Sequence, residues 1–423
     1  MVIQTDAVAP PLSSARADDS ASARSKIIIY SHDTYGLGHL RRCTKIAKAL
    51  KAAFSNSSIL IITGSPHAGK YELPDGLDFV KLPAVVKTGA NQYEPRSLGG
   101  SFEDILRLRQ NLILETVRTF SPHLLIVDHA PLGMKGEMKE TLRWLKNHNP
   151  DCGLILGLRD IIDEPDSVIA SWLRDDVYDY LDNIYDRILV YGPPSIFDPT
   201  YSYRFSEKAR SKTSFTDYIV DFEGGNELLT IPEKGKAERK QIFLTVGGGE
   251  DGVHIVRSYM EMLSRHVDDL RVSSTIVCGP FFPPEMKVAI KACAESLRVE
   301  LHDFVSDITG HMRSADLVIS MGGYNTVTEI LANARKALII PREHPRKEQL
   351  LRAQRLSETG VISYVSAETL TTETLYERVA ELLNDSDQPI TKARDSGTLS
   401  LNGGSKIVEF CRPMLESRIE AAR

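Results

Sequence analysis

The chain has 423 residues, of which 42% are hydrophobic and 26% are charged. This length favours two domains over a single core, and the composition is typical of a globular protein. With 51 basic and 57 acidic residues the net charge is -6. A protein that binds nucleic acid usually has a basic excess, so we expect no nucleic-acid partner.

The five cysteines are odd in number and none forms a C-x-x-C pair. This argues against a disulfide framework or a zinc cluster and fits a reducing compartment. No apolar stretch reaches the roughly 18 residues that a membrane span needs. Residues 1–25 lack the apolar core of a secretory signal, so we expect a disordered tail there and a cytoplasmic protein.

Short apolar runs alternate with helical patterns in the first half of the chain. The helical pattern over 101–120 starts with a capping box formed by Ser101 and Asp104. Continuous apolar strands separated by helices indicate a parallel sheet covered on both faces. The expected strands are residues 26–31, 58–63, 77–82, 123–128, 153–158 and 187–192.

The second half repeats this alternation of apolar runs and helical patterns. It follows a linker over residues 193–240 that is rich in Pro, Ser, Lys and Glu. Its expected strands are residues 241–246, 273–279, 298–302, 315–320 and 336–341. We therefore predict an α/β protein with two doubly wound, Rossmann-like domains that face a cleft. Ligands are expected outside the carboxyl ends of the strands.

The first glycine loop, "SHDTYGLGHLRR" (31–42), follows the first strand and opens a helix. Such loops usually hold phosphate. This one also carries His39, which could instead act in catalysis. His32, Asp33, Arg41 and Arg42 are expected to support the site or to contact the acceptor.

The second glycine loop, "TVGGGEDG" (245–252), matches the dinucleotide pattern G-x-G-x-x-G. A nicotinamide or flavin site should also have an acidic residue at the end of the next strand, but Cys278 and Gly279 stand there. The loop can still direct backbone N–H groups at an anion, and a tight turn without a ligand is the alternative.

The third loop, "ISMGGYNTVTEIL" (319–331), again joins a strand to a helix. Thr326 and Glu329 fit a capping box, which gives Glu329 a structural role. The alternative is that its carboxylate accepts the ribose hydroxyls of a nucleotide.

A basic segment follows, "IIPREHPRKEQLLRAQRL" (339–356). A solvated helix face is the usual explanation of such a run. This run starts at the carboxyl end of a strand, so we expect His344, Glu348 and Gln349 to lie in the cleft.

The order of these motifs resembles the nucleotide-sugar domain of GT-B glycosyltransferases. It is most similar to glycosyltransferase family 28, which includes the UDP-N-acetylglucosamine transferase of peptidoglycan synthesis. The similarity covers most of residues 241–356 and extends more weakly to "GLGH". It implies an acceptor-side domain over 26–205, a nucleotide-sugar domain over 206–392 and a C-terminal helix over 393–423 that packs on the N-terminal domain.

The resemblance also implies roles for individual residues. The base would lie at Phe304 and Val305, the ribose at Glu329, and the donor sugar at His344, Glu348 and Gln349. The nucleotide phosphates would be held by the glycine loops and the start of the following helix. The residues implied there are Gly38, Gly247, Gly248, Gly249, Gly322, Gly323, Asn325 and Thr326.

Glycosyl transfer needs a general base for the acceptor hydroxyl. His39 is placed for this role, and Asp128 at the end of another strand could orient its imidazole. A His–Asp pair at these places resembles that of UDP-glycosyltransferases that act on small molecules. In family 28 the corresponding histidine is thought to lie near the diphosphate, so both roles of His39 stay open.

The expected activity is therefore transfer of a hexose from a UDP-sugar to a hydroxyl acceptor. We expect no metal and no cofactor, because the sole D-x-D, residues 385–387, follows a helix. A UDP-sugar epimerase or nucleotide-sugar hydrolase is the alternative, and a non-catalytic sensor is a third reading. The acceptor could be a saccharide, a lipid-linked saccharide or a small molecule. Residues 85–100 are expected to form a flexible loop on the acceptor side. A lipid-linked acceptor would imply peripheral contact with the membrane.

Overall fold

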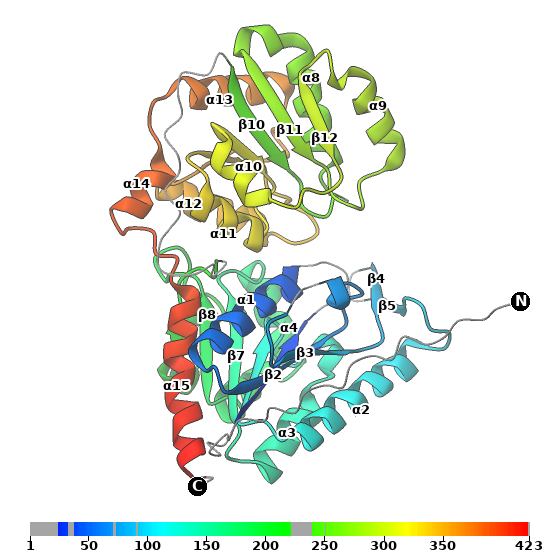
Figure 1. Ribbon diagram of the computed structural model, residues 1–423, viewed down its shortest axis with the longest axis vertical. Helices are drawn as coiled ribbons and strands as arrows, with labels where there is room; N and C mark the ends of the chain where they lie inside the picture. The colour runs from blue at the N-terminus through cyan, green and yellow to red at the C-terminus, as the bar shows by residue number, and fades with distance from the viewer. Residues whose placement is uncertain are drawn as a thin grey trace, which may run out of the picture.

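The computed structural model describes residues 24–32, 38–70, 73–89, 92–220, 239–249 and 251–421. It has two lobes, each built on a parallel sheet with helices on both faces (Figure 1). The expected α/β fold with two Rossmann-like domains is therefore confirmed. The predicted tail over 1–25 falls almost entirely outside the described residues.

The N-terminal sheet has seven strands in the order β3-β2-β1-β6-β7-β8-β9. Alternate residues of β1 enter different apolar clusters, Ile27 and Ile29 in one and Ile28 and Tyr30 in the other. This is why the strand reads as a continuous apolar run. The strands are β1 (Ser25–Ser31), β2 (Ser57–Thr63), β3 (Leu77–Lys81), β6 (Leu124–Asp128), β7 (Gly153–Arg159), β8 (Arg187–Tyr191) and β9 (Thr213–Phe215).

Helices cover both faces of this sheet. Ser101 caps α2 by accepting a hydrogen bond from the backbone N–H of Asp104 at 3.1 Å. The helices are α1 (Gly38–Ala53), α2 (Phe102–Phe120), α3 (Lys139–His148), α4 (Pro165–Arg174), α5 (Val177–Asn183), α6 (Pro199–Ser202) and α7 (Glu207–Ser211).

Two expectations for this domain need correction. Residues 85–100 were expected to be a flexible loop, but β4 (Val85–Gly89) and β5 (Gln92–Pro95) pair there as an antiparallel hairpin. Strand β9 pairs with β8 beyond the boundary predicted at residue 205. The N-terminal sheet therefore continues into the segment that we assigned to the donor domain.

The C-terminal sheet has six strands in the order β12-β11-β10-β13-β14-β15. These are β10 (Lys240–Thr245), β11 (Val272–Val277), β12 (Val299–His302), β13 (Leu317–Ser320), β14 (Ala337–Ile339) and β15 (Ser363–Tyr364). The helices are α8 (Val253–Leu270), α9 (Pro284–Ala294), α10 (Ile308–Ser314), α11 (Tyr324–Asn333), α12 (Glu348–Glu358), α13 (Thr372–Asn384), α14 (Pro389–Asp395) and α15 (Gly403–Ala421).

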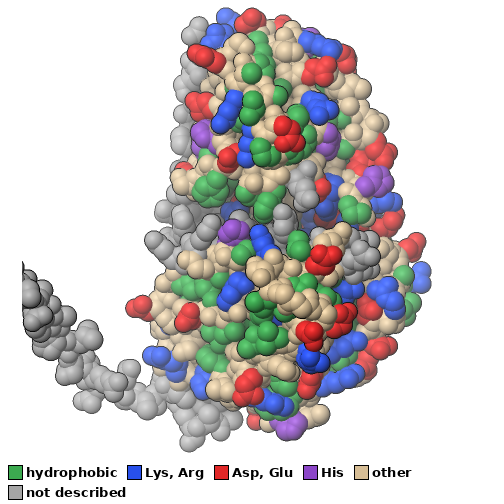
Figure 2. All heavy atoms as spheres, turned by 90° about the vertical axis from the view of Figure 1, so that its right-hand side faces the viewer, with side chains coloured by type: hydrophobic (Ala, Val, Ile, Leu, Met, Phe, Trp, Pro, Cys, Tyr) green, Lys and Arg blue, Asp and Glu red, His purple; other side chains and the backbone are tan. Residues whose placement is uncertain are grey.

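The last helix, α15, returns to the N-terminal lobe and lies against α1 (Figure 1). Its buried side chains Ile407, Cys411 and Leu415 share an apolar cluster with Leu40 of α1. The chain therefore crosses between the lobes twice. Figure 2 shows a hollow between the lobes, with basic side chains visible in it.

Candidate active site

The centre of the site is a hydrogen-bonded group formed by His39, Asp128 and Arg42. Strands β1 and β6 are parallel neighbours, so their carboxyl ends bring the start of α1 beside Asp128. His39 Nδ1 lies 2.8 Å from Asp128 Oδ2. Arg42 donates from Nε to Oδ1 at 2.8 Å and from Nη2 to Oδ2 at 2.7 Å. The pairing of His39 with Asp128 that we expected is thus present as a contact.

The charge of Arg42 and the burial of the group determine the protonation of Asp128 and His39. Burial alone would raise the pKa of Asp128, but the Arg42 charge and the hydrogen bonds from His39 and Arg42 hold it well below its usual range. A carboxylate only accepts, so the contact with Asp128 assigns the proton to His39 Nδ1 and the lone pair to Nε2, and Arg42 Nη2, which also lies 2.9 Å from Nδ1, then bonds Asp128 instead. Burial, together with the nearby Arg42, lowers the pKa of His39 from its ordinary 6.5. His39 is therefore a neutral imidazole with a free basic nitrogen.

Two more histidines stand beside His39. The ring centroid of His129 lies 5.0 Å from that of His39, and the ring centroid of His32 lies 5.5 Å from it. Burial lowers the pKa values of His32 and His129 well below the ordinary histidine value. His129 is 7% exposed and has φ of 66°. A non-glycine residue held at positive φ is often part of a functional site.

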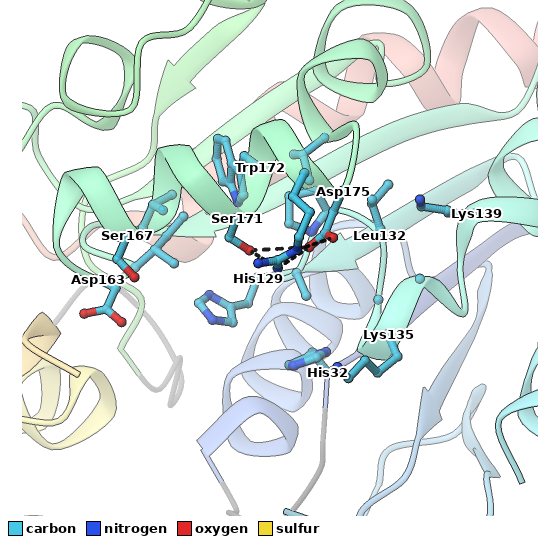
Figure 3. Close-up of a pocket in the computed structure, with 18 of the residues that line it drawn as sticks. His32, His129, Leu132, Lys135, Lys139, Asp163, Ser167, Ser171, Trp172 and Asp175 are labelled. Carbon is cyan, nitrogen blue, oxygen red and sulfur yellow. Dashed lines mark hydrogen bonds and ion pairs between the residues drawn. The ribbon is translucent and has the colours of Figure 1, made fainter. Parts of the chain in front are cut away.

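A cavity of about 1640 Å³ opens next to these histidines, mainly on the N-terminal lobe. Figure 3 shows His32 and His129 near its centre, with Asp163 and Ser167 on one side and Lys135 and Lys139 on the other. Aromatic side chains also line it, among them Tyr93, Trp144 and Trp172. This cavity is the candidate acceptor site.

Two glycine loops of the C-terminal lobe follow the carboxyl ends of β10 and β13. Gly247 and Gly249 adopt φ of 64° and 100°, and a Cβ on Gly249 would lie 2.2 Å from the Cys278 carbonyl oxygen. Gly249 is therefore required by the close approach of the two loops. Gly247 and Gly323 have no heavy atom within 4 Å of a Cβ position, so there is open space beside both loops. Gly248 faces Phe281 instead.

Glu329 lies inside α11 and does not cap it. The N-cap residue is Gly323 and no side-chain cap is present, so the predicted capping box with Thr326 is wrong. Glu329 Oε1 instead accepts from Arg41 Nη2 at 2.6 Å and from Lys45 Nζ at 3.5 Å, both in α1 of the other lobe. Its Oε2 is buried and has no hydrogen-bond partner among the described residues.

Glu348, the first residue of α12, also has one carboxylate oxygen bonded to an arginine and the other without a described partner. Arg342 Nη2 donates to its Oε1 at 2.6 Å, whereas Oε2 is buried without a partner among the described residues. Gln349 Oε1 accepts from the Arg342 backbone N–H at 3.1 Å and so holds the loop before α12. Glu329 and Glu348 each present one buried acceptor oxygen, which suits a ligand with hydroxyl donors.

Other expected contacts differ from this arrangement. His344 was expected in the cleft, but its side chain is 78% exposed and its Nε2 lies 3.2 Å from Glu368. Asn325 donates to the Gly38 carbonyl oxygen at 2.8 Å, so these two residues join the lobes. Phe304 is 75% exposed, whereas Val305 packs partly against the core. Residues 33–37 of the first loop, with Asp33, lie outside the described residues.

A fully buried ion pair joins α12 of the C-terminal lobe to the N-terminal lobe. Arg352 of α12 donates from Nη2 to Asp160 Oδ1 at 2.7 Å and from Nε to Oδ2 at 2.9 Å. Lys347 adds a bond from its Nζ to Glu164 at 2.9 Å. The two lobes are therefore joined by several polar contacts.

Within the described ranges, no group of three or more His, Cys, Asp or Glu side chains could hold a metal ion. Sequence reasoning missed His129, Arg159, Asp160 and Arg352. The available signal was position, because His129 and Asp160 each directly follow the last residue of a buried strand.

Comparisons with known proteins identify a matching family domain and several similar chains. Residues 242–408 match the glycosyltransferase family 28 C-terminal domain. The chain is 24% identical over 268 residues to the UDP-N-acetylglucosamine–N-acetylmuramyl-(pentapeptide) pyrophosphoryl-undecaprenol N-acetylglucosamine transferase of Histophilus somni, covering 61% of this chain and 70% of that protein. The Rhodospirillum rubrum enzyme of the same name is 31% identical over 159 residues, covering 36% of this chain and 40% of that protein.

Solved structures show the same fold. The glycosyltransferase of kitacinnamycin superposes with a TM-score of 0.62 at 14% identity, covering 93% of this chain and all of that one. Acinetobacter baumannii MurG gives 0.58 at 13% identity, covering 92% of this chain and all of that one. The chain is therefore a glycosyltransferase of the GT-B fold. Within that class it is similar to family 28, whose C-terminal domain it carries.

Proposed function

We propose that this enzyme transfers a hexose from a UDP-sugar to a hydroxyl acceptor without a metal ion or cofactor. The observation that carries the proposal is the 2.8 Å contact between His39 and the buried Asp128, beside His129, which lines the cavity. Neutral His39 has the free nitrogen that a general base requires.

In the proposed reaction, His39 Nε2 takes the proton of the acceptor hydroxyl. The acceptor oxygen forms a bond to the anomeric carbon, and the bond from that carbon to the diphosphate oxygen breaks. UDP leaves with the electron pair. Asp128 holds the imidazole and stabilises its charged form, while Arg42 keeps Asp128 ionised.

The donor assignment rests on the C-terminal lobe. The relatives in Histophilus somni and Rhodospirillum rubrum are named for a UDP-N-acetylglucosamine donor. In this chain Glu329 Oε2 would accept a ribose hydroxyl and Glu348 Oε2 a sugar hydroxyl. Phe304 and Val305 would contact the base. The open space at Gly247 and Gly323 would admit the diphosphate.

The acceptor would enter the cavity on the N-terminal lobe. Those relatives are named for an undecaprenol-linked acceptor, whereas one structural neighbour is an anthocyanidin glucosyltransferase. We propose a lipid-linked saccharide or a small hydroxylated molecule as the acceptor, and a cytoplasmic enzyme that meets the inner face of the membrane in the lipid-linked case. No helix in the described ranges is long and apolar enough to cross a bilayer.

The test has two stages. Thermal shift with UDP, UDP-sugars and NAD identifies the nucleotide, since a ligand at a hundred times its Kd adds about 2.7 kcal/mol of stability. The enzyme is then incubated with the most stabilising donor and with lipid extracts or small alcohols as acceptors, and mass spectrometry detects the products. We expect stabilisation by UDP-sugars and a product that contains acceptor and sugar. Stabilisation by NAD alone, or conversion of the donor without any acceptor, would overturn the transferase proposal.

A further inference from the structure

Arg159 is partly buried and differs from three fully buried arginines of this protein. Arg42, Arg109 and Arg352 each make two hydrogen bonds to one carboxylate, on Asp128, Glu137 and Asp160 respectively. Arg159, the last residue of β7, forms no ion pair with any described carboxylate and donates only to His129. Its guanidinium therefore has no directly bonded carboxylate among the described residues.

The contact with His129 does not balance this charge. Arg159 Nε lies 3.2 Å from His129 Nδ1 and its Nη2 lies 3.1 Å from His129 Nε2. Arginine has donors only, so His129 must stay neutral to accept from it. Burial lowers the pKa of Arg159 to about 10, the charges of Glu348 and Asp160 oppose this shift, and those of Arg42 and Arg352 add to it. A cation in this setting favours an anionic partner.

The other lobe presents the complementary group. Glu348 lies one turn before Arg352 in α12, and Arg352 bonds Asp160, the residue next to Arg159. The Glu348 carboxylate is therefore near Arg159 but forms no ion pair with it among the described contacts. Glu348 is 6% exposed, and its buried Oε2 has no hydrogen-bond partner among the described residues. A ligand between the two residues needs acceptor oxygens for Arg159 and a hydroxyl donor for Glu348 Oε2. A sugar linked to phosphate meets both needs.

We propose that Arg159 of the N-terminal lobe binds the donor phosphate next to the sugar, while Glu348 of the C-terminal lobe accepts a hydroxyl of that sugar. This inference rests on the proposed function, since it places a further residue in the same donor site. The donor site is then incomplete in either lobe alone. As the bond from the sugar to the phosphate breaks, charge grows on the phosphate oxygens, and Arg159 stabilises it.

The test compares nucleotides by calorimetry. Arg159→Gln should raise the Kd of UDP about 10- to 100-fold, the usual effect of a hydrogen bond to a charged group. The Kd of UMP, which lacks the second phosphate, should change less than about twofold. The Kd of UDP for Arg159→Lys should lie between those of the wild type and Arg159→Gln, because an ammonium keeps the charge but lacks the planar pair of N–H donors of a guanidinium. Arg107→Gln is the control, since Arg107 is 74% exposed and pairs with Asp104 on α2.

Stability separates a ligand contact from a structural role. Removing a partly buried charge that has no directly bonded carboxylate should leave the Tm of free Arg159→Gln unchanged or raise it. A lowered Tm with unchanged UDP affinity would overturn the inference, and so would equal losses of UMP and UDP affinity. If wild-type protein binds no UDP, the proposed function itself fails. If wild type binds UDP and Arg159→Gln binds it equally well, only the role of Arg159 fails.

Discussion

Arg41 in the first helix of one lobe donates to Glu329 in the other lobe at 2.6 Å, and the bond ends on Oε1 alone. Lys45 reaches the same oxygen at 3.5 Å. The two cations therefore hold Glu329 in place and leave Oε2 unoccupied among the described residues. One carboxylate can thus join the lobes and still accept a hydrogen bond from a ligand.

Glu329→Gln should weaken UDP binding by about 10-fold or more, because a hydrogen bond to a charged group contributes roughly 1.5 to 3 kcal/mol. The amide keeps the size of the side chain but loses the charge that Arg41 and Lys45 face. Calorimetric titration with UDP and with uracil base measures the effect, and we expect uracil binding to change little.

Glu358→Gln provides the matched control, because Glu358 is an exposed acid that pairs with Arg355 within α12. A Glu329→Gln protein with lowered Tm and normal UDP affinity would assign Glu329 to the lobe contact alone.

The pH dependence of transfer should report His39. Its pKa is lowered by burial and by Arg42 and Arg159, while Asp128 opposes these effects. Because the base must be neutral, the rate should stay high as pH falls through 6.5, the ordinary histidine value, and decline only below it. His148→Asn, which removes an exposed histidine of α3, should leave this profile unchanged. A decline centred above 6.5 would contradict the lowered pKa.

Transfer should also survive EDTA, because the described residues contain no cluster of potential ligands for magnesium or manganese. The measurement is product formation after prolonged dialysis against chelator, with the same protein dialysed against buffer as the control. Loss of turnover that added Mg²⁺ or Mn²⁺ restores would show that this expectation is wrong.

The sequence predicted the parts of the fold that depend on local pattern. The apolar runs of β1, β6 and β10 are buried on both faces, so they read clearly as parallel strands. The hairpin of β4 and β5 was read as a loop because its strands are short and outside the main sheets. The Thr326–Glu329 pattern was misread because α11 begins at Tyr324, which places both residues inside the helix.

The site was predictable where a residue follows a strand or glycine turn, as His39 and Asp128 do. Contacts between the lobes were not predictable from the sequence. No local pattern indicates that Arg352 pairs with Asp160, which lies 192 positions away in the chain. Arg352 lies in the basic run over residues 339–356, for which the sequence predicts a place at the cleft but no partner for this arginine. Pairing across a cleft depends on how two domains dock, which no periodic pattern records.

Arg352→Ala should destabilise the protein by about 3–5 kcal/mol, because it leaves Asp160 charged, buried and unpaired. Urea unfolding measures the change. Arg355→Ala on the same helix is the control, since the exposed pair of Arg355 with Glu358 contributes at most about 1 kcal/mol. Similar small losses for both variants would show that the buried pair does not hold the lobes together.

The role of His39 can be settled by a double-mutant cycle with Asp128. If His39 is the base, His39→Ala should lower turnover by about 10²- to 10⁴-fold and leave UDP affinity nearly unchanged, because the donor would lie mainly on the other lobe. Asp128→Asn should give a smaller loss, since the imidazole loses its orienting carboxylate. The double variant should be little worse than His39→Ala, because paired catalytic residues act as a unit. Asp186→Asn, which breaks the partly exposed pair of Asp186 with Lys146, is the control for Asp128. Additive losses of turnover together with weaker UDP binding by His39→Ala would instead place His39 on the diphosphate, and the base would then be another group beside the cavity.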